Sequence, residues 1–353
     1  MNNDVFNIGG IEIGQARRCF VIAEAGVNHN GDRQLARELV LAAKRIGADA
    51  VKFQTFRAAG VITSDAQKAP YQLRTTDPAE SQTAMLGRLE MSEDLHVELI
   101  ELCRQQGIVF LSTPYDFRDV DMLQKLDVAA FKLASIHCAE PAFVEYAAGT
   151  GKPIILATGM ATLGEVELAV LAARRTGNRK LVLLQCTTDY PSRIEDANLL
   201  ALKTMRKAFE VPVGYSDHTE DSTACVAAVA LGACVIEKHL TLDRNMPGPD
   251  HAASHDPEQF AALVRAIRQA EKALGTGVKE PCAAERANMS TMRRSIAARR
   301  DIASGERLTQ EMIAFLRPAS GLSPASLPQF VGRRFARPVG QGRLISQDDF
   351  ADD

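Results

Sequence analysis

Two histidines are the residues of this sequence best suited to hold a metal ion. His218 lies in the stretch GYSDHT and His239 in VIEKHLT, each at the end of a short apolar run typical of a β-strand. If the two strands are neighbours, about 4.8 Å apart, both imidazoles can reach one ion. Two imidazoles leave the other positions to water and substrate oxygens, which suits a Lewis acid that polarises a carbonyl group. The pair predicts a divalent ion, Mn²⁺ or Mg²⁺, in preference to structural zinc.

Two lysines predict an anion-binding pocket. Lys52 lies in AVKFQTF, with Gln54 two residues further on, and Lys132 lies in FKLAS. Residues two apart on a strand share a face, so both lysines can point into one site. Burying an unpaired ammonium group is costly, and a bound phosphate and carboxylate would offset that cost. The alternative is that the lysines are paired with Glu24 or Glu237.

Two carboxylates could position or deprotonate a water molecule. Glu24 ends the first apolar run, and Asp250 lies in the loop MPGPDHAAS after the last one. Either could instead pair with a lysine or with metal-bound water. The other loop histidines are His29, His251 and His255, for which solvation is expected and no catalytic step is assigned.

The elements that must position these residues alternate between β-branched runs and amphipathic stretches, the pattern of parallel strands with crossover helices. Eight such runs lie near Phe20, Val51, Ile108, Phe131, Ile154, Leu181, Val213 and Val235. Between the first two runs, Asp32 can begin a helix and Gly47 can end it. The prediction is an α/β fold of the TIM (β/α)8 barrel type, whose reactive face lies at the carboxyl ends of the strands.

The longest connection between the runs extends from Arg57 to Met91 and contains Pro70, Tyr71 and Pro78. A long loop above a barrel strand is commonly a lid or a binding element. A disordered insertion is the alternative.

The chain is predicted to contain a second, smaller domain. Two glycines and a proline in GTGVKEPCAAE have the composition of a linker, and the apolar stretches from Met292 onward are short and broken by glycine and proline. The predicted division is a catalytic barrel over residues 1–280, a linker over 281–291 and a β-rich module over 292–353.

Composition argues against several classes of protein. The net charge of −3 over 353 residues, with mixed signs, offers no basic face for nucleic acid. No apolar run is long enough to span a bilayer, and the start has no secretory signal pattern, so a cytoplasmic protein without a membrane partner is expected. The seven cysteines show no metal or redox spacing and are expected to be free thiols.

The motifs together resemble the sialic acid synthase family. They include AEAGVNHNGD, VKFQTF, LSTPYD, FKLAS, GKPIILATGM, CTTDYPS, GYSDHT and EKHLTLDRNMPGPDHAAS, in this order along nearly the whole chain. The tail resembles an antifreeze-like (SAF) domain. The resemblance implies a transferase that condenses phosphoenolpyruvate with an open-chain N-acetylated mannosamine-type sugar and water. The products would be phosphate and a nine-carbon 2-keto-3-deoxy acid.

The resemblance also implies which residues act. The phosphoenolpyruvate set would be Lys52, Thr113, Lys132, Ser135 and Ser216. The metal would be held by His218 and His239. The residues facing the sugar or the reacting water would be Glu24, Gln54, Tyr190 and Asp250. Arg317, in FLRPASG, would reach the active site of a partner subunit, because the family is a domain-swapped homodimer.

Three departures from the family pattern bear on the sugar. Relatives commonly have Ser-Gly-Glu where this chain has Ser135, Ile136 and His137, a serine near Ala157, and sometimes an asparagine where Thr188 stands. His137 could replace the missing glutamate as a hydrogen-bond partner of a differently substituted sugar. N-acetylmannosamine, giving N-acetylneuraminate, and a 2,4-diacetamido-6-deoxy sugar, giving N,N'-diacetyllegionaminate, both remain open. A pseudaminate synthase using a 6-deoxy-diacetamido-altrose is the alternative.

Other classes of function make different predictions. A Schiff-base aldolase would use Lys52, Lys132 or Lys238 as nucleophile, but leaves the histidine pair unexplained. A metal-dependent hydrolase is disfavoured because the first run ends in Glu24 and Asn28 and lacks a His-x-His pair. A carbohydrate-binding or ice-binding protein is disfavoured by the charged barrel mouth and the absence of threonine repeats.

Overall fold

The computed structural model describes residues 5–63 and 65–351, apart from the side chains of 70, 71 and 74. It forms two compact units, Met1–Gly275 and Thr276–Asp353. We call them unit 1 and unit 2. Among the described residues, no helix combines the length and apolar character needed to cross a bilayer.

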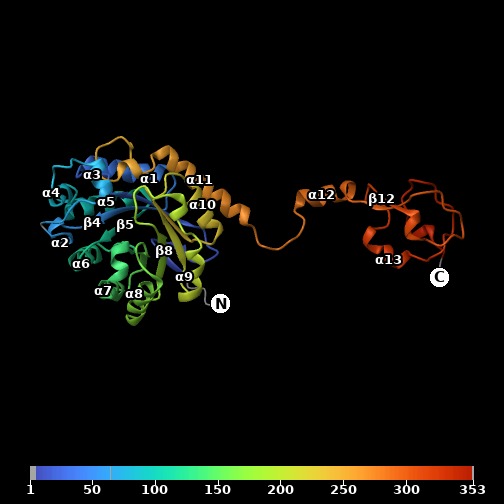
Figure 1. Ribbon diagram of the computed structural model, residues 1–353, viewed down its shortest axis with the longest axis horizontal. Helices are drawn as coiled ribbons and strands as arrows, with labels where there is room; N and C mark the ends of the chain where they lie inside the picture. Colours follow the sequence, from blue (N-terminus) through green and yellow to red (C-terminus); the bar gives the residue numbers. More distant parts are fainter. Residues whose placement is uncertain (1–4, 64, 352–353) are drawn as a thin grey trace. The chain divides into compact units, whose positions relative to one another are not determined.

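Unit 1 is a closed barrel of eight parallel strands in the order β10-β3-β4-β5-β6-β7-β8-β9. The predicted (β/α)8 barrel is confirmed. The strands are β3 (Phe20–Gly26), β4 (Ala50–Thr55), β5 (Val109–Pro114), β6 (Phe131–Leu133), β7 (Ile154–Ala157), β8 (Leu181–Cys186), β9 (Val213–Asp217) and β10 (Val235–His239). Figure 1 shows the chain passing from strand to outer helix around this barrel.

Helices cover the outside of the barrel. They are α1 (Arg33–Arg45), α5 (Glu93–Gln106), α6 (Phe117–Lys125), α7 (Pro141–Gly149), α8 (Leu163–Arg175), α9 (Ala201–Phe209), α10 (Thr223–Ala230) and α11 (Pro257–Leu274). Helix α1 begins as predicted at Asp32, whose carboxylate accepts from the amides of Gln34 and Leu35. Its buried face includes Leu39 and Val40. The apolar stripe of such a helix supplies most of the energy that holds it to the sheet.

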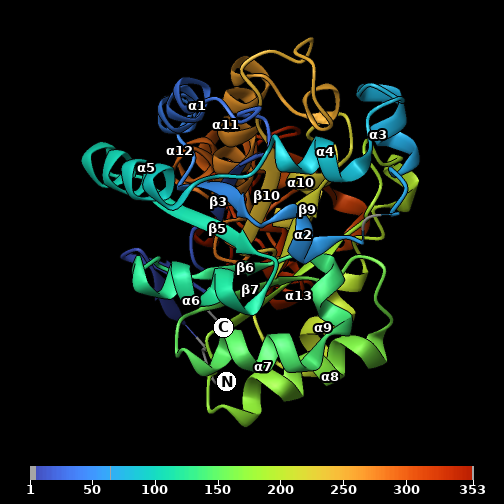
Figure 2. The same cartoon turned by 90° about the vertical axis from the view of Figure 1, so that its left-hand side faces the viewer.

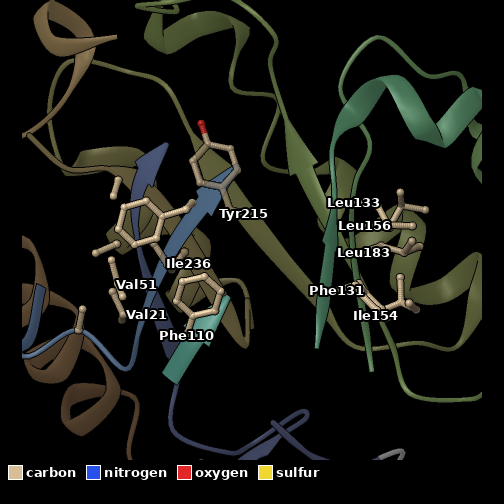
Figure 3. Packing of buried hydrophobic residues seen from close by; sticks show 14 of the residues in the cluster. Val21, Val51, Phe110, Phe131, Leu133, Ile154, Leu156, Leu183, Tyr215 and Ile236 are labelled. Carbon is tan, nitrogen blue, oxygen red and sulfur yellow. The ribbon is translucent and has the colours of Figure 1, made fainter. Parts of the chain in front are cut away.

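The side chains of each strand alternate between two cores. Val21, Val51, Phe110, Tyr215 and Ile236 belong to the layer between strands and helices (Figure 3). The intervening positions point into the barrel, where a separate apolar cluster fills its lower part. The hairpin of β1 (Phe6–Ile8) and β2 (Ile11–Ile13) adds to this second cluster. The apolar side chains therefore leave polar groups only the upper end of the barrel.

The long connection after β4 contains three short helices, α2 (Ala58–Val61), α3 (Pro70–Thr75) and α4 (Gln82–Gly87). Figure 2 shows them on the viewer's side of the barrel, with the outer helices around the strands. Phe56, Val27 and Leu89 form a small apolar cluster that anchors this segment. The described part of the segment is therefore structured, as a binding element requires, and is not a disordered insertion.

Unit 2 has its own small core, which includes Ile296, Phe335 and Phe350. Its elements are α12 (Ala283–Met292), β11 (Ser295–Ala298), β12 (Ile313–Leu316) and α13 (Leu327–Phe330). Residues 281–291, expected to be a linker, contain most of α12. The carboxylate of Glu285 accepts from the amide of Cys282 at 2.8 Å and so stabilises the start of this helix.

Candidate active site

A cavity open to solvent lies at the carboxyl ends of the barrel strands. The predicted residues that line it are Glu24, Lys52, Gln54, Thr113, Lys132, Ser135, Tyr190, Ser216, His218, His239 and Asp250. The remaining predicted residue, Arg317, follows β12 in unit 2, and its side chain is exposed. The side chains chosen from separate strands therefore meet at one place in unit 1.

The two histidines lie side by side because β9 and β10 are paired with Asp217 opposite Lys238. The ring centroids of His218 and His239 are 5.4 Å apart. His218 Nδ1 donates to the carbonyl oxygen of Thr187 at 2.6 Å, since a carbonyl can only accept. This bond occupies Nδ1 and leaves Nε2 as the nitrogen of His218 that could face a ligand.

His239 is buried, and its Nδ1 has no hydrogen-bond partner in the described structure. Burial, reinforced by the positive charge of His218 and nearby lysines, lowers the pKa of His239 well below its usual value, so the imidazole is neutral. The nearest carboxylate oxygen is that of Asp250, 3.8 Å from Nδ1. Burial raises the pKa of Asp250 to about 6.

These properties fit a divalent ion that the protein holds through few ligands. The neutral imidazole of His239 is a suitable donor and has an unsatisfied buried nitrogen. Burial acts to lower the pKa of His218, but Cys186 and the Thr187 carbonyl hold it above its usual value, so a metal ion would bind His218 with loss of its proton. Within residues 5–63 and 65–351, no three or more His, Cys, Asp or Glu side chains are grouped so as to enclose an ion. His218 and His239 would therefore leave most coordination positions to water and substrate oxygens.

Both lysines are buried and ion-paired. Lys52 Nζ lies 2.7 Å from a carboxylate oxygen of Glu24 and donates to the hydroxyl of Thr113 at 3.0 Å. Lys132 Nζ lies 3.2 Å from a carboxylate oxygen of Glu237. The pairing with Glu24 and Glu237, weighed as an alternative to an anion pocket, is therefore present. It does not close the site, because both lysines also line the open cavity.

The lysine partners Glu24 and Glu237 differ in their pKa. Burial raises the pKa of Glu24 to about 7, against the opposing effect of Lys52. Burial also acts to raise the pKa of Glu237, but Lys132 and Lys52 together hold it below its usual value. At neutral pH, Glu237 is therefore ionised while Glu24 is divided between its two forms. A carboxyl group poised near pH 7 is able both to accept and to donate a proton.

Tyr115 is a cavity residue that the sequence analysis did not single out. Its hydroxyl donates to Gln54 Oε1 at 3.3 Å, and Gln54 Nε2 donates to Glu24 Oε1 at 3.4 Å. Tyr115 lies immediately after β5, so the preference of barrel enzymes for strand ends could have identified it. The chain of hydrogen bonds orients Glu24 from the rim of the cavity.

The possible contact of His137 with the substrate, to which a neutral substitution was the alternative, is not supported. His137 is buried, bonds Glu140 through Nδ1 at 2.8 Å and stacks on Phe143, and it does not line the cavity. The cavity is lined by its neighbour Ile136, which is 43% exposed. The residues from Ser135 turn into a 3-10 helix, η1, which reverses the side-chain positions expected for a continued strand.

Of the other two positions that differ from the family pattern, one lines the cavity and one does not. Thr188 lines the cavity, whereas Ala157 is buried and does not. A side chain at Gly159 would come within 2.3 Å of the Thr188 hydroxyl, and the amide of Gly159 donates to Ser135 Oγ at 3.0 Å. A glycine is therefore needed beside these two hydroxyl groups.

The expected solvation of the loop histidines is also wrong. His29, His251 and His255 are all buried. His251 Nδ1 lies 2.7 Å from the Thr241 hydroxyl, because the loop after β10 folds back onto the strand end. None of the three lines the cavity, in keeping with the absence of an assigned catalytic step.

Comparison with known proteins places these features in context. The NeuB family matches residues 39–279, and the SAF domain matches residues 293–351. An N,N'-diacetyllegionaminic acid synthase from Legionella pneumophila is 44% identical over 336 residues, 94% of each chain. A pseudaminic acid synthase from Helicobacter pylori is 35% identical, over 93% of this chain and 97% of that protein. The crystal structure of an N-acetylneuraminic acid synthetase from Leptospira borgpetersenii superposes with a TM-score of 0.72 at 33% identity, covering 81% of this chain and 95% of that one.

Proposed function

The chain belongs to the NeuB family, and from this premise we propose that it is a nonulosonic acid synthase. It condenses phosphoenolpyruvate with an open-chain N-acetylated mannosamine-type sugar and water, giving a nine-carbon 2-keto-3-deoxy acid and phosphate. The observation that carries the proposal is the meeting of two buried lysines, Lys52 and Lys132, with the His218–His239 pair in one cavity. Relatives named for the diacetyllegionaminic and pseudaminic reactions are 44% and 35% identical, so the pseudaminate alternative is the more distant one.

Phosphoenolpyruvate binds through charge and hydrogen bonding. Lys52 and Lys132 provide two ammonium groups for its phosphate and carboxylate, and cation-to-anion hydrogen bonds of this kind are the strong ones. The hydroxyl groups of Thr113, Ser135 and Ser216 line the same cavity and can donate to the remaining oxygens. Fixing the substrate in this way supplies the orientation that a condensation requires.

The proposed metal ion is Mn²⁺ or Mg²⁺, held by His218 and His239. When bound, it supplies Lewis acidity toward the aldehyde oxygen of the sugar. Tyr190 encloses this position, because its ring centroid lies 4.1 Å from that of His218 and 5.7 Å from that of His239.

The bond changes in the reaction require groups that accept protons and groups that donate them. The methylene carbon of phosphoenolpyruvate bonds to the aldehyde carbon, water adds at C2, and the C2–O bond to phosphate breaks. Water must lose both of its protons, of which one is gained by the aldehyde oxygen and the other leaves with the phosphate. Glu24, with its pKa near 7, and Asp250, with its pKa near 6, are the groups positioned to accept and return these protons.

The small domain is part of the proposal. We propose that the protein is a cytoplasmic, domain-swapped homodimer in which Arg317 of one subunit reaches the sugar in the other. The exposed side chain of Arg317 supports this, since a guanidinium group on the surface of unit 2 is free to meet a polar substrate group. The match of residues 293–351 to the SAF domain gives the same support.

A Schiff-base aldolase is less well supported. Lys52 and Lys132 are ammonium groups paired with carboxylates, and pairing with Glu237 raises the pKa of Lys132 against the effect of burial. Such a group is a poor nucleophile. The third candidate, Lys238, bonds Asp217 at 2.6 Å and does not line the cavity.

The deciding experiment measures inorganic phosphate released by the full-length protein with Mn²⁺ or Mg²⁺. Release is expected only when phosphoenolpyruvate and an N-acetylated mannosamine-type sugar are both present. Release from phosphoenolpyruvate alone would show hydrolysis instead. A borohydride-trapped adduct between protein and substrate would favour the aldolase.

A further inference from the structure

The hydroxyl of Tyr115 determines which end of the Gln54 amide faces Glu24. Gln54 Nε2 donates to Glu24 Oε1 at 3.4 Å, and Tyr115 donates to Gln54 Oε1 at 3.3 Å. An ionised carboxylate only accepts hydrogen bonds, so the amide must turn its nitrogen to Glu24 and its oxygen to Tyr115. Both bonds are long, as is common in a site without substrate. Without the tyrosine hydroxyl, nothing among these groups would keep the amide from turning over.

The bond from Gln54 limits the rotation of the Glu24 carboxylate. The second carboxylate oxygen lies 2.7 Å from Lys52 Nζ. Lys52 is also one of the groups proposed to bind phosphoenolpyruvate, so its hold on Glu24 weakens when the substrate is present. A Cβ atom at Gly26 would lie 3.2 Å from Glu24 Oε1 and 3.5 Å from Gln54 Nε2, so the bond needs a residue without a side chain there. The amide of Gln54 is therefore the group that keeps Glu24 oriented during the reaction.

The ring of Tyr115 is held from two sides. His137 meets it edge to face with centroids 5.7 Å apart, and Phe56 does so at 5.8 Å. The backbone amide of Tyr115 donates to the carbonyl oxygen of Thr55 at 3.2 Å, which ties the residue to the end of β4. Aromatic pairs in this arrangement are directional and attractive. The hydroxyl of Tyr115 is thus presented to Gln54 from a fixed ring.

His137 is itself fixed, although it lies outside the cavity. Its side chain is buried, its ring stacks on Phe143 with centroids 4.2 Å apart, and its Nδ1 lies 2.8 Å from a carboxylate oxygen of Glu140. A continuous set of contacts therefore leads from His137 through Tyr115 and Gln54 to Glu24.

We propose that His137 and Tyr115 are positioning residues that act in series on the reaction. His137 holds the ring of Tyr115, and Tyr115 directs the amide of Gln54 toward Glu24. This inference rests on the proposed function, in which Glu24 exchanges protons with the reacting groups. Neither His137 nor Tyr115 supplies a charge for phosphoenolpyruvate. Their loss should therefore lower kcat and leave KM for phosphoenolpyruvate nearly unchanged.

The first test is Tyr115→Phe, which removes the hydroxyl and keeps the ring. The assay uses the full-length, metal-loaded enzyme, phosphoenolpyruvate, and whichever of N-acetylmannosamine and 2,4-diacetamido-2,4,6-trideoxymannose the parent turns over faster. The kcat from phosphate release should fall by about 3- to 10-fold, the value of one neutral hydrogen bond. KM for phosphoenolpyruvate should change by less than about 2-fold.

Tyr146→Phe is the matched control. It also removes a tyrosine hydroxyl, which donates to Asp121 at 2.7 Å, but from a ring that is 42% exposed and does not line the cavity. Its kcat should equal that of the parent. Melting temperatures of both variants should stay near the parent value, because each keeps its ring.

Double variants separate positioning from a general effect on the fold. In Gln54→Ala no amide is left to direct, so adding Tyr115→Phe should change kcat by less than about 2-fold. His137→Leu, which removes the ring beside Tyr115, should lower kcat by about 2- to 10-fold and add little to Tyr115→Phe. His137→Phe keeps a ring and should retain most of the parent kcat. Because only the half-exposed Glu140 loses a partner, this conservative variant should also fold.

Three outcomes would count against the proposal. A parent-like kcat in Tyr115→Phe, or the same fall in kcat with and without Gln54, would overturn it and leave the proposed function intact. Equal losses in His137→Phe and His137→Leu would remove His137 from the series. No phosphate release by the parent with either sugar would overturn the proposed function as well.

Discussion

The ammonium group of Lys238 lies 2.6 Å from the carboxylate of Asp217, with both side chains buried on the outer face of the barrel. Each residue directly precedes one of the two cavity histidines in the sequence. Lys238 also donates to the carbonyl oxygen of Thr219 at 2.7 Å, and Asp217 accepts from the Thr219 amide at 2.9 Å. The ion pair therefore joins the ends of β9 and β10 on the outer face of the barrel, next to the two histidines.

Replacing Asp217 by Asn should destabilise the protein by about 3–5 kcal/mol, because it leaves the buried ammonium of Lys238 without a counter-charge. Denaturant unfolding measures this free energy. The double variant Asp217→Asn, Lys238→Met should recover most of the loss. The matched control is Asp127→Asn, which breaks the Lys152–Asp127 pair at the same kind of distance, 2.7 Å, but with Asp127 92% exposed, and its effect on the free energy of unfolding should be far smaller because solvent screens the pair. Equal losses at both sites would refute the importance of the buried pair.

Replacing Lys132 by Met should weaken phosphoenolpyruvate binding by about 10- to 100-fold, the value of one lost charge-assisted hydrogen bond. The variant also leaves Glu237 buried without its closest partner, so stability must be separated from affinity. Adding Glu237→Gln should restore stability and leave the affinity low. Isothermal titration calorimetry measures the affinity, and the variant Lys152→Met, which also removes a lysine from an ion pair but lies outside the cavity, serves as control. Normal affinity in Lys132→Met would remove this lysine from the binding set.

Binding of phosphoenolpyruvate should be accompanied by proton uptake at Glu24. The pKa of Glu24 in the free protein is about 7 because burial outweighs its pairing with Lys52. A bound anion shares Lys52 and adds negative charge, and both effects raise this pKa further. The carboxyl therefore takes up a proton on binding, and affinity should fall as pH rises above about 7, by no more than roughly 10-fold per pH unit.

Calorimetry at pH 7.5 in buffers of different ionisation enthalpy measures the number of protons taken up. At this pH Asp250, with a pKa of about 6, is mostly ionised and contributes little. Glu24→Gln should abolish the protein's share of the uptake and leave only that of the ligand. Proton release by the parent protein, or equal uptake by both proteins, would contradict the assignment.

The site residues that lie on strands can be predicted from the sequence, because strand periodicity alone determines where their side chains lie. His218, His239, Lys52 and Lys132 were found because they interrupt or end apolar strands, and a barrel brings all strand ends to one edge. Periodicity does not decide the partner of Lys52, because that partner depends on the register that sets Glu24 opposite Lys52, and register is a property of the pairing of two strands.

Residues beyond the strand ends were harder to predict. Ile136 lines the cavity and His137 is buried, the reverse of what a continued strand would give. The reason is that the chain enters a 3-10 helix at Ser135, which changes the direction of every following side chain. The loop histidines were expected in solvent, although tertiary folding of the loop after β10 buries them. Such contacts have no signature in a single sequence.

Removal of divalent metal should abolish turnover, and Mn²⁺ or Mg²⁺ should restore it in the parent protein. His218→Ala should remain inactive after metal is added, because only one imidazole is left to hold the ion. Direct titration of Mn²⁺, followed by electron paramagnetic resonance, should show binding weakened by about 10- to 100-fold in the variant. Full activity after exhaustive chelation would refute a catalytic metal.

Arg317 provides the test of a shared active site. Arg317→Ala should lower kcat/KM by about 10- to 100-fold, since a guanidinium hydrogen bond to substrate contributes about 1.5–3 kcal/mol, and Arg317→Lys should restore only part of it.

If the arginine acts across the dimer, mixing Arg317→Ala with His218→Ala and allowing subunits to exchange should recover activity. In a mixed dimer, one site combines an intact histidine pair with an intact arginine. An equal mixture that exchanges freely should then reach about a quarter of parent activity. No recovery, despite exchange shown by mass spectrometry of differently labelled subunits, would mean that Arg317 acts within its own chain or not at all.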